Sequence, residues 1–429
     1  MTLRIGIVLI GFGWILCGSP AFSANESAKE IISVLDDTGI VLEKAVGNDG
    51  SVFDEIVYAV RRSGSDHWYA NFGFYACPTH EYPSQRVEGK VCVPPIYKEG
   101  GRLCRTNLRT GKTDVLIDDP KGTVRDPKVH YDGKTIVFSY RKGGRPYFNL
   151  YEIQADGTGL KQLTDGRFND IEPTYLPDGG IMFCSDRCRR FVNCWRTPVA
   201  VLYRCDGDGR NIRMISSNIE HDNTPWVLPD GRVMYMRWEY VDRSQGAFHH
   251  LWTTNPDGTS QMVYYGNQRP GYVMIDAKPL PGSNKVVAIF SPGHGRPEHC
   301  GYVTIVDPNL GPDDPAGTSR ICSDVGLRDP YPLSQSSFLV AKGAVIYLLS
   351  KDGTLTPLCR LDKPGFALHE PRPLLPRPRE RVISPRTDLR QKTGTLVLAD
   401  IYHGRSMKGV QQGEVEKLLV LEQLPKPVN

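Results

Sequence analysis

The 429-residue sequence predicts an all-β protein, a six-bladed β-propeller. The main observation is an internal repeat whose copies start at 127, 173, 225, 277, 330 and 371, at intervals of 41 to 53 residues. Four-stranded units of roughly 40–50 residues are typical of propeller blades. The 43 glycines and 33 prolines fit this fold, because many short strands require many tight turns.

Each repeat contains two hairpins. In the first, an acidic residue usually precedes Pro, and a turn and an apolar strand follow. The starts are Asp126-Pro127, Glu172-Pro173, Thr224-Pro225, Asp276-Ala277, Asp329-Pro330 and Glu370-Pro371. The second hairpin turns at Asp156-Gly157, Asp208-Gly209 and Asp257-Gly258 in three of the repeats. Asp-Gly supplies the positive φ angles of a two-residue hairpin, so each repeat holds four strands.

The first unit needs a strand from the far end of the chain. Residues 55–60, 102–108 and 113–117 read as three strands that lack the acidic opening strand. We expect the strand at 370–376 to complete them, which closes a propeller over residues 55–376 and removes exposed sheet edges. The alternative is seven blades, with residues 370–424 as a unit of their own.

The N-terminus predicts export. Arg4, an apolar run at 5–17 and small residues near Ser23 are typical of a secretory signal peptide, here 1–23. The run is too short to cross a membrane, and no later segment is longer, so we expect no membrane span in the mature chain. The expected location is periplasmic or extracellular. A net charge of +4 argues against a nucleic-acid partner.

Other segments flank or interrupt the propeller. Residues 24–54 form an N-terminal lead-in, and the insert at 64–101 is expected to lie over one mouth of the channel. Residues 377–392 are a Pro- and Arg-rich linker, and apolar runs at 394–401 and 415–424 predict two strands. Residues 377–429 are therefore expected to be a linker with a short C-terminal β extension, the start of a truncated further module.

The acidic repeat starts are candidate binding residues, because equivalent positions of a propeller converge on its central channel. With neighbouring histidines they form the candidate channel-mouth set: Asp126, Glu172, His221, Asp222, Asp276, His294, Asp329, His369 and Glu370. A carboxylate ring binds a hard cation or the basic groups of a partner. In the structural alternative, the carboxylates cap backbone amides or pair with Arg125 and Arg328.

Histidines from different blades also fit a transition-metal site or acid–base chemistry. The candidate metal ligands are His221, His294, His369 and Glu172. A divalent metal is the cofactor that these residues indicate. The alternative is that the histidines only hydrogen-bond to turns.

Cysteine usage favours disulfides. Eleven cysteines, less Cys17 in the signal peptide, leave ten, an even number in an exported chain. The disulfide candidates are Cys77 with Cys92, and pairs within Cys184, Cys188, Cys194 and Cys205. The second group could instead hold Zn²⁺ as thiolates, although it contains only one spacing of the usual zinc type.

The blade phrase resembles TolB-type and WD40-like propellers. Longer strings resemble the propeller region of hydrazine synthase alpha subunit-like proteins: WYANFG at 68–73, VRDP at 124–127, DIEPTYLPDGG at 170–180, SNIEHDNTPW at 217–226, SPGHG at 291–295 and HEPRP at 369–373. The resemblance implies a propeller, followed in that family by c-type haem domains. This sequence has no Cys-x-x-Cys-His motif, so we expect no covalent haem and no hydrazine synthesis from this chain alone.

The absence of catalytic motifs favours a binding or scaffold domain over an enzyme. The sequence has neither a Gly-x-Ser-x-Gly nucleophile elbow nor a phosphate-binding Gly-rich loop that opens a helix. We expect a protein partner, and the resemblance indicates a c-type cytochrome supplied by another chain. Two alternatives stay open, a metal-dependent enzyme with a His and carboxylate site at the channel mouth, and a truncated form of a longer haem protein.

Overall fold

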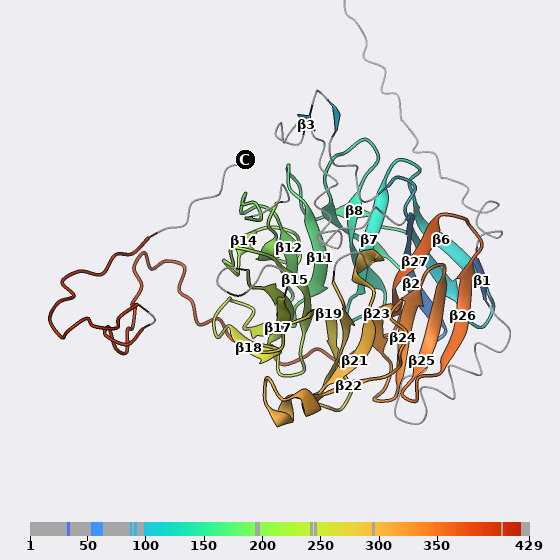
Figure 1. Cartoon of the computed structure of the whole chain (residues 1–429). Coiled ribbons are helices and arrows are strands. Elements are labelled where there is room, and N and C mark those ends of the chain that lie inside the picture. Colours follow the sequence, from blue (N-terminus) through green and yellow to red (C-terminus); the bar gives the residue numbers. More distant parts are fainter. Residues whose placement is uncertain are drawn as a thin grey trace, which may run out of the picture.

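The computed structural model describes residues 32–34, 53–62, 86–87, 90–91, 98–193, 198–240, 243, 247–293, 297–404 and 406–421. Within these residues the fold is almost entirely antiparallel β-sheet (Figure 1). The predicted all-β propeller is confirmed. The signal peptide predicted at 1–23 and most of the insert at 64–101 lie outside the described residues.

The innermost strands form a closed ring. Each one opens a sequence repeat and contacts the innermost strand of the next repeat, and the last contacts the first. They are β7 (Thr123–Val129), β11 (Asp170–Tyr175), β15 (Asp222–Val227), β19 (Tyr272–Pro279), β23 (Arg328–Pro332) and β27 (Phe366–Pro373).

Each of the first five inner strands is followed by three antiparallel strands. These are β8 (Thr135–Arg141), β9 (Asn149–Gln154) and β10 (Lys161–Gln162); β12 (Ile181–Ser185), β13 (Val201–Cys205) and β14 (Arg213–Met214); β16 (Val233–Trp238), β17 (Phe248–Thr254) and β18 (Met262–Tyr265); β20 (Val286–Ser291), β21 (Tyr302–Val306) and β22 (Thr318–Arg320); β24 (Ser337–Lys342), β25 (Val345–Ser350) and β26 (Leu355–Leu361). A short parallel pairing of β17 with β19 joins two of these groups into one sheet.

The last inner strand closes the ring as the sequence predicts. β27 pairs with β2 (Glu55–Arg62), which continues into β5 (Arg102–Asn107) and β6 (Thr113–Asp118). A C-terminal strand therefore completes an N-terminal sheet. The remaining elements are small: β1 (Ile32–Val34) on the edge of β26, the pair β3 (Arg86–Val87) and β4 (Lys90–Val91), and the 3₁₀ turns η6 (Pro297–His299), η7 (Pro308–Leu310) and η8 (Pro315–Gly317).

Each inner strand has a β-bulge at the same repeat position. In β7 the register shifts between Arg125 and Lys128, and the equivalent shift occurs in the other five. The residue at the bulge has a positive φ, for example 58° at Asp126 and 54° at Glu172. A non-Gly residue in this region costs roughly 1–3 kcal/mol and persists where the surrounding structure holds it. The Pro that usually follows lacks an N–H, so the bulge leaves no ladder donor unpaired there.

The hydrophobic core lies between neighbouring sheets, where the middle strands are buried on both faces. All five residues of β12 and all six of β20 are buried. Aromatic side chains such as Phe138, Phe183 and Tyr235 fill the space between sheets. Because apolar burial of this kind is the main stabilising contribution, the inner strands can present polar side chains to the channel.

The C-terminal segment differs from the prediction. Residues 374–421 contain no described strand, so the expected β extension at 394–401 and 415–421 is wrong. Its apolar side chains are exposed, by 74% at Leu396, 89% at Val397 and 76% at Leu419. A strand needs a partner for its backbone groups and a surface to bury its apolar face, and the described chain offers this segment neither. Figure 1 shows the segment (red) looping outward from the sheets.

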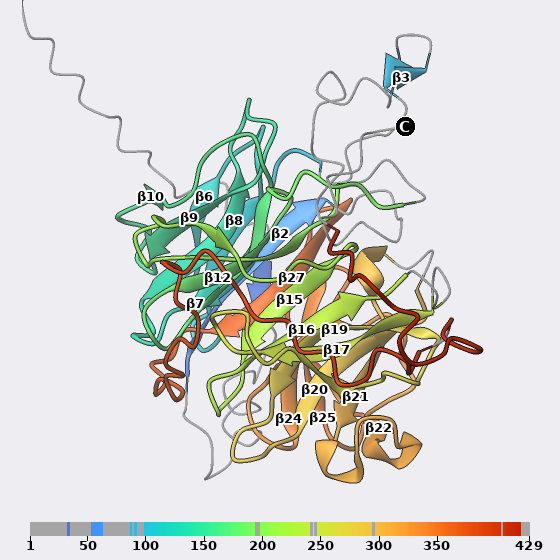
Figure 2. The same ribbon diagram turned by 90° about the vertical axis from the view of Figure 1, so that its left-hand side faces the viewer.

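Residues 374–386, which we call the strap, do pack on the propeller. The Arg377 amide donates to the Tyr131 carbonyl at 3.1 Å, and the Tyr131 hydroxyl donates to Glu380 at 2.5 Å. Further along, the Arg386 amide donates to Asp257 at 2.5 Å. The strap thus crosses the β7–β8 and β17–β18 turns, and Figure 2 shows the C-terminal segment (dark red) in front of the propeller. Among the described residues, no helix has the length and apolar character to cross a membrane.

Candidate functional site at the channel mouth

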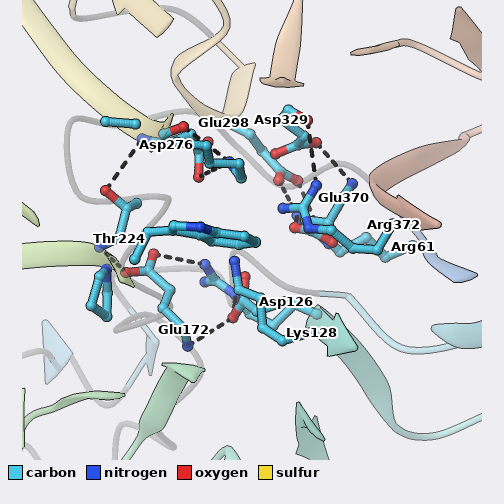
Figure 3. A pocket seen from close by; sticks show the side chains of 15 residues that line it. Arg61, Asp126, Lys128, Glu172, Thr224, Asp276, Glu298, Asp329, Glu370 and Arg372 are labelled. Atoms are coloured by element: carbon cyan, nitrogen blue, oxygen red, sulfur yellow. Dashed lines mark hydrogen bonds and ion pairs between the residues drawn. The ribbon is translucent and has the colours of Figure 1, made fainter. Parts of the chain in front are cut away.

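The bulge residues of the inner strands converge at the centre of the propeller. They are Asp126, Glu172, Thr224, Asp276, Asp329 and Glu370, with φ between 50° and 58°, and we call them the ring. All six line one central cavity (Figure 3). The repeat pattern therefore locates the carboxylates correctly in five units, and the sixth position is taken by a threonine.

Asp222, which the sequence suggested for that sixth position, lies two residues earlier. Its side chain is fully buried and pairs with Arg237, with Nε to Oδ1 at 3.0 Å and Nη2 to Oδ2 at 3.2 Å. The bulge lies at the residue immediately before Pro225, which is Thr224. The Asp222 carboxylate is consequently used inside its own sheet rather than in the ring.

Backbone hydrogen bonds link ring residues of neighbouring repeats. The Glu172 amide donates to Asp126 Oδ2 at 3.0 Å, and the Thr224 amide donates to Glu172 Oε2 at 2.7 Å. In the same way the Asp276 amide donates to Thr224 Oγ1 at 3.2 Å. The Glu370 amide likewise donates to Asp329 Oδ2 at 3.0 Å. Each such side chain satisfies a backbone donor that the bulge removes from the ladder.

Arginines neutralise the ring. Arg125 donates to Asp126 at 2.6 Å and to Glu172 at 3.2 Å. Arg61, from the end of β2, forms two parallel hydrogen bonds with Glu370, at 2.9 and 2.8 Å. Bidentate pairs of this type are among the stronger charge-assisted hydrogen bonds. The ring is therefore a buried ion-pair network and not an open anionic surface.

A second layer lies two residues further along the inner strands, on the same side because side chains alternate with period two. Here the indole of Trp226 is surrounded by cations, with Lys128 Nζ 4.3 Å, Lys278 Nζ 5.2 Å and the Arg372 guanidinium 5.6 Å from its ring centroid. Such contacts are favourable cation–π interactions. The two layers leave a cavity of only ≈ 30 Å³, which is room for about one or two water molecules.

Burial and charge set the ionisation of the ring unevenly. Burial raises the pKa of Glu172 to about 7 despite the nearby Arg125 charge. Burial likewise raises the pKa of Asp329 to about 7. Burial also opposes ionisation of Asp126, but Arg125 outweighs it and lowers the pKa of that carboxyl. Near neutral pH Asp126 is therefore ionised, whereas Glu172 and Asp329 exchange between their ionised and protonated forms.

The predicted histidines occupy different places. His369 precedes the ring residue Glu370 and is fully buried, with Nδ1 3.3 Å from Glu298 Oε2. His221 lies elsewhere, where its Nδ1 accepts from the Ala200 amide at 3.1 Å and its ring stacks on Trp238. Burial lowers the pKa of both imidazoles well below the usual value. His294 lies outside the described residues.

Sequence analysis missed two residues of this site. Arg61 ends a strand with no motif around it, and Glu298 lies in the η6 turn at φ 48°. In the folded protein the Arg61 guanidinium contacts both Glu298 and Glu370. These residues are 237 and 309 positions from Arg61 in the sequence, so no local pattern could have connected them.

The predicted disulfides are not found among the described cysteines. Cys184, Cys188 and Cys205 are free, while Cys77, Cys92 and Cys194 lie outside the described residues. Cys184 and Cys205 sit at opposite ends of the β12–β13 pair, since Cys184 faces Leu202 and Cys205 faces Ile181. Burial raises the pKa of the Cys205 thiol to about 12 and also raises those of Cys184 and Cys188. Neutral thiols are poor zinc ligands.

A second hollow, which we call the loop groove, has a volume of ≈ 650 Å³. Its floor is aromatic, formed by the buried rings of Tyr140, Tyr147 and Tyr151. The Tyr140 hydroxyl donates to Asp119 at 2.7 Å, which fixes that part of the floor. Asn149 also lines the groove, and its buried amide nitrogen has no hydrogen-bond partner among the described residues.

The rim of the loop groove is basic. It carries exposed Lys142, Arg145 and Arg167, with Asp165 as the acidic member. These residues belong to the β8–β9 and β10–β11 connections, which lie at the end of the strands away from the β7–β8 turn. An aromatic floor with a cationic rim suits an anionic ligand or an acidic protein surface.

Comparison with known proteins agrees with the fold. No protein-family profile matches the chain. In sequence it is 25% identical to hydrazine synthase subunit alpha of Kuenenia stuttgartiensis in an alignment of 309 residues that covers 58% of this chain and 37% of that protein. It is 23% identical over 281 residues to the Tol-Pal system protein TolB of Francisella tularensis, covering 57% of this chain and 62% of TolB.

In structure the chain resembles Kuenenia stuttgartiensis hydrazine synthase, with a TM-score of 0.64 and 21% identity over 79% of this chain and 49% of that one. The chain is thus a β-propeller. It is similar to TolB and, in particular, to the hydrazine synthase alpha subunit, which confirms the resemblance expected from its sequence strings. It spans less than two thirds of the length of each of these relatives.

Proposed function

We propose that the chain is an exported binding propeller that holds an acidic partner protein at the loop groove. The composition of the loop groove is the observation that supports this proposal. It combines three exposed cationic side chains, Lys142, Arg145 and Arg167, with a buried tyrosine floor and the unpaired Asn149 amide. Aromatic anchors surrounded by arginine are typical of protein-binding surfaces.

The central channel supports binding rather than catalysis. Its volume of ≈ 30 Å³ is far below the roughly 300–1,000 Å³ of small-molecule sites. Arg61, Arg125 and Trp226 occupy the space in which an organic substrate would have to lie. The channel residues therefore act mainly as a rigid support for the loops around the mouth.

The partner class follows from the resemblance. One relative is named as the alpha subunit of a larger enzyme, and the other as part of the Tol–Pal system. This chain has no covalent haem motif of its own. A c-type cytochrome with an acidic surface is the partner that we propose to test first.

Binding is tested with a charge-reversed groove, Lys142→Glu/Arg145→Glu/Arg167→Glu, against purified c-type cytochromes of the host cell envelope by calorimetry. We expect a saturable complex whose affinity falls with salt and drops roughly 100-fold or more in the variant, because each lost attraction becomes a repulsion.

The matched control reverses the same number of charges at the opposite end of the strands, as Lys134→Glu/Arg210→Glu/Lys351→Glu, all of them exposed turn residues. This variant should bind as the wild type does. Equal weakening in both variants, or no saturable binding by the wild type to any cytochrome tested, contradicts the proposal.

Export is tested separately. The mature protein recovered from the periplasm or medium should begin after Ser23 when its N-terminus is determined by mass spectrometry. Recovery of intact residues 1–23 in the cytoplasmic fraction would rule export out.

A further inference from the structure

Two adjacent residues of β27 meet a residue of the distant η6 turn at one edge of the ring. Glu298, His369 and Glu370 each offer one ligand atom, and these atoms all lie within 4.8 Å of one another. Their side chains are 8%, 0% and 7% exposed. We propose that this cluster is a binding site for a single divalent transition-metal ion of the Zn²⁺ type.

His369 provides the strongest indication of a ligand. Its imidazole is completely buried, and neither ring nitrogen has a hydrogen-bond partner among the described residues. Nδ1 points at the cluster, 3.3 Å from Glu298 Oε2 and 3.9 Å from Asp329 Oδ2. Leaving a buried polar group unpaired costs about 1–3 kcal/mol. A metal ion bound to Nδ1 would satisfy it.

The three ligand atoms must move closer together to hold the ion. Zinc binds nitrogen and oxygen ligands at about 2.0–2.2 Å in a tetrahedron, so two ligand atoms on one ion are about 3.3–3.6 Å apart. The three cluster atoms lie within 4.8 Å of one another, so a contraction of up to about 1.5 Å is needed. The adjoining cavity of ≈ 30 Å³ has room for a water molecule as a fourth ligand.

The ligand types select the ion. Two carboxylates and one imidazole form a mixed oxygen and nitrogen set, which suits Zn²⁺ and its first-row neighbours better than Ca²⁺, because calcium prefers six or more oxygens. No thiol belongs to the cluster. A copper(I) or iron–sulfur site is therefore not expected there.

Arg61 supplies the positive charge that pairs with the two carboxylates of the cluster. Its guanidinium contacts Glu298 and forms the bidentate pair with Glu370. An arriving divalent ion must displace this contact, so Arg61 and the metal compete for the same two carboxylates. The Arg61 charge also favours the ionised forms of Asp126 and Asp329. The competition predicts a moderate affinity that rises when Arg61 is removed.

This inference is independent of the proposed partner binding, because Glu298 and Glu370 line the channel and none of the three ligands lines the loop groove. The ion would tie the η6 turn to β27. Its role is to stabilise the mouth of the channel.

The test uses the full mature chain, stripped with chelator and titrated with Zn²⁺ by calorimetry, with Co²⁺ absorption as a second readout. We expect one equivalent of Zn²⁺ to bind, and visible Co²⁺ bands of a low-coordinate site. His369→Ala and Glu298→Gln should each weaken binding roughly tenfold or more, as loss of a ligand does. His130→Ala, at a histidine outside the cluster, should not.

Arg61→Gln gives a second test in the opposite direction, because it removes the competing cation and keeps all three ligands. It should bind Zn²⁺ more tightly than the wild type, and Zn²⁺ should raise its melting temperature more than that of the wild type. The proposal is overturned if the wild type binds no stoichiometric Zn²⁺, if binding survives both ligand substitutions, or if Arg61→Gln binds Zn²⁺ no better than the wild type.

Discussion

The β20 strand and the segment at 395–400 have similar sequences but different structures. VVAIFS in β20 is buried at every position between β19 and β21, whereas TLVLAD at 395–400 is exposed and forms no strand. Both runs have high β propensity. The difference is that β20 has a partner strand on each side. Within this molecule, pairing and burial decide whether an apolar run becomes a strand.

The strap lies between these two cases. Residues 374–386 have no partner strand, yet they are held by contacts with turns such as Tyr131 and Asp257. The channel, the strap and the exposed end should therefore respond very differently to mutation.

The largest effect is expected in the channel. Arg61→Gln leaves the carboxylates of Glu298 and Glu370 buried without their common cation, and should lower the free energy of unfolding by about 3–5 kcal/mol in metal-free buffer. Urea denaturation measures it. The control is Arg102→Gln, which breaks a more exposed pair with Asp118 and should cost less than about 1 kcal/mol. Similar losses in both variants would show that burial does not raise the cost of breaking the ion pair.

The strap should show an intermediate effect. Gly231 has φ +90°, and a Cβ there would lie 2.1 Å from the Arg381 carbonyl oxygen, whereas Gly179 has φ +91° and nothing within 4 Å. Both alanine substitutions carry the same backbone strain. Gly231→Ala should therefore lose about 1–2 kcal/mol more than Gly179→Ala, because only it pushes the strap away.

Limited trypsin digestion gives a second readout for the same pair of variants. Cleavage within 377–386 should accelerate in Gly231→Ala and not in Gly179→Ala, since a detached segment opens more readily to protease. Equal cleavage rates would show that the strap does not depend on this contact.

A smaller effect should appear in the pH dependence of stability. The pKa of Glu172 is raised to about 7 in the folded protein, so the fold holds a proton that the unfolded chain releases at lower pH. The stability from this group is present below its unfolded pKa and is lost as the pH rises toward 7. Glu172→Gln should flatten the decline between roughly pH 5 and pH 7 by an amount of order 1 kcal/mol.

Asp132→Asn is the matched control for the pH series. The pKa of Asp132 is lowered to about 2, since hydrogen bonds from Thr135 and nearby amides outweigh its partial burial. Both its folded and unfolded values lie below the tested range, so its slope should match that of the wild type. An equal decline in Glu172→Gln and in the wild type would mean that Glu172 is ionised throughout this pH range.

The smallest effect is expected at the exposed end. Deleting all residues after 392 removes the exposed Leu396, Val397 and Leu419 and no described sheet contact. The free energy of unfolding should change by less than about 0.5 kcal/mol. A larger loss would show that this segment does pack on the propeller.

The repeat made much of the fold predictable. The turn spacing located the inner strands, and the missing opening strand of the first unit predicted the pairing of β27 with β2. The repeat also located five of the ring residues. At the remaining position the repeat suggested Asp222, because a carboxylate was expected there. The bulge instead falls on the residue immediately before Pro225, which is Thr224.

The candidate metal cluster was only partly predictable. His369 and Glu370 could be singled out because they adjoin a repeat start, but Glu298 lies in a turn without a motif. The disulfide prediction relied on the number and order of cysteines. Neither shows that Cys184 and Cys205 occupy opposite ends of a strand pair.

The sequence by itself determined the strands and turns of the repeats and five of the six ring positions, because periodicity and turn chemistry are local properties of the chain. The tertiary structure alone decided which charges meet there. Arg61 reaches Glu298 and Glu370 only after the ring has closed, and the low polarity of the closed centre makes their pairing strong. It also decided that the apolar runs at 395–400 and 415–421 form no strand, because an apolar run becomes a strand only where a partner strand and a surface to bury it are in place.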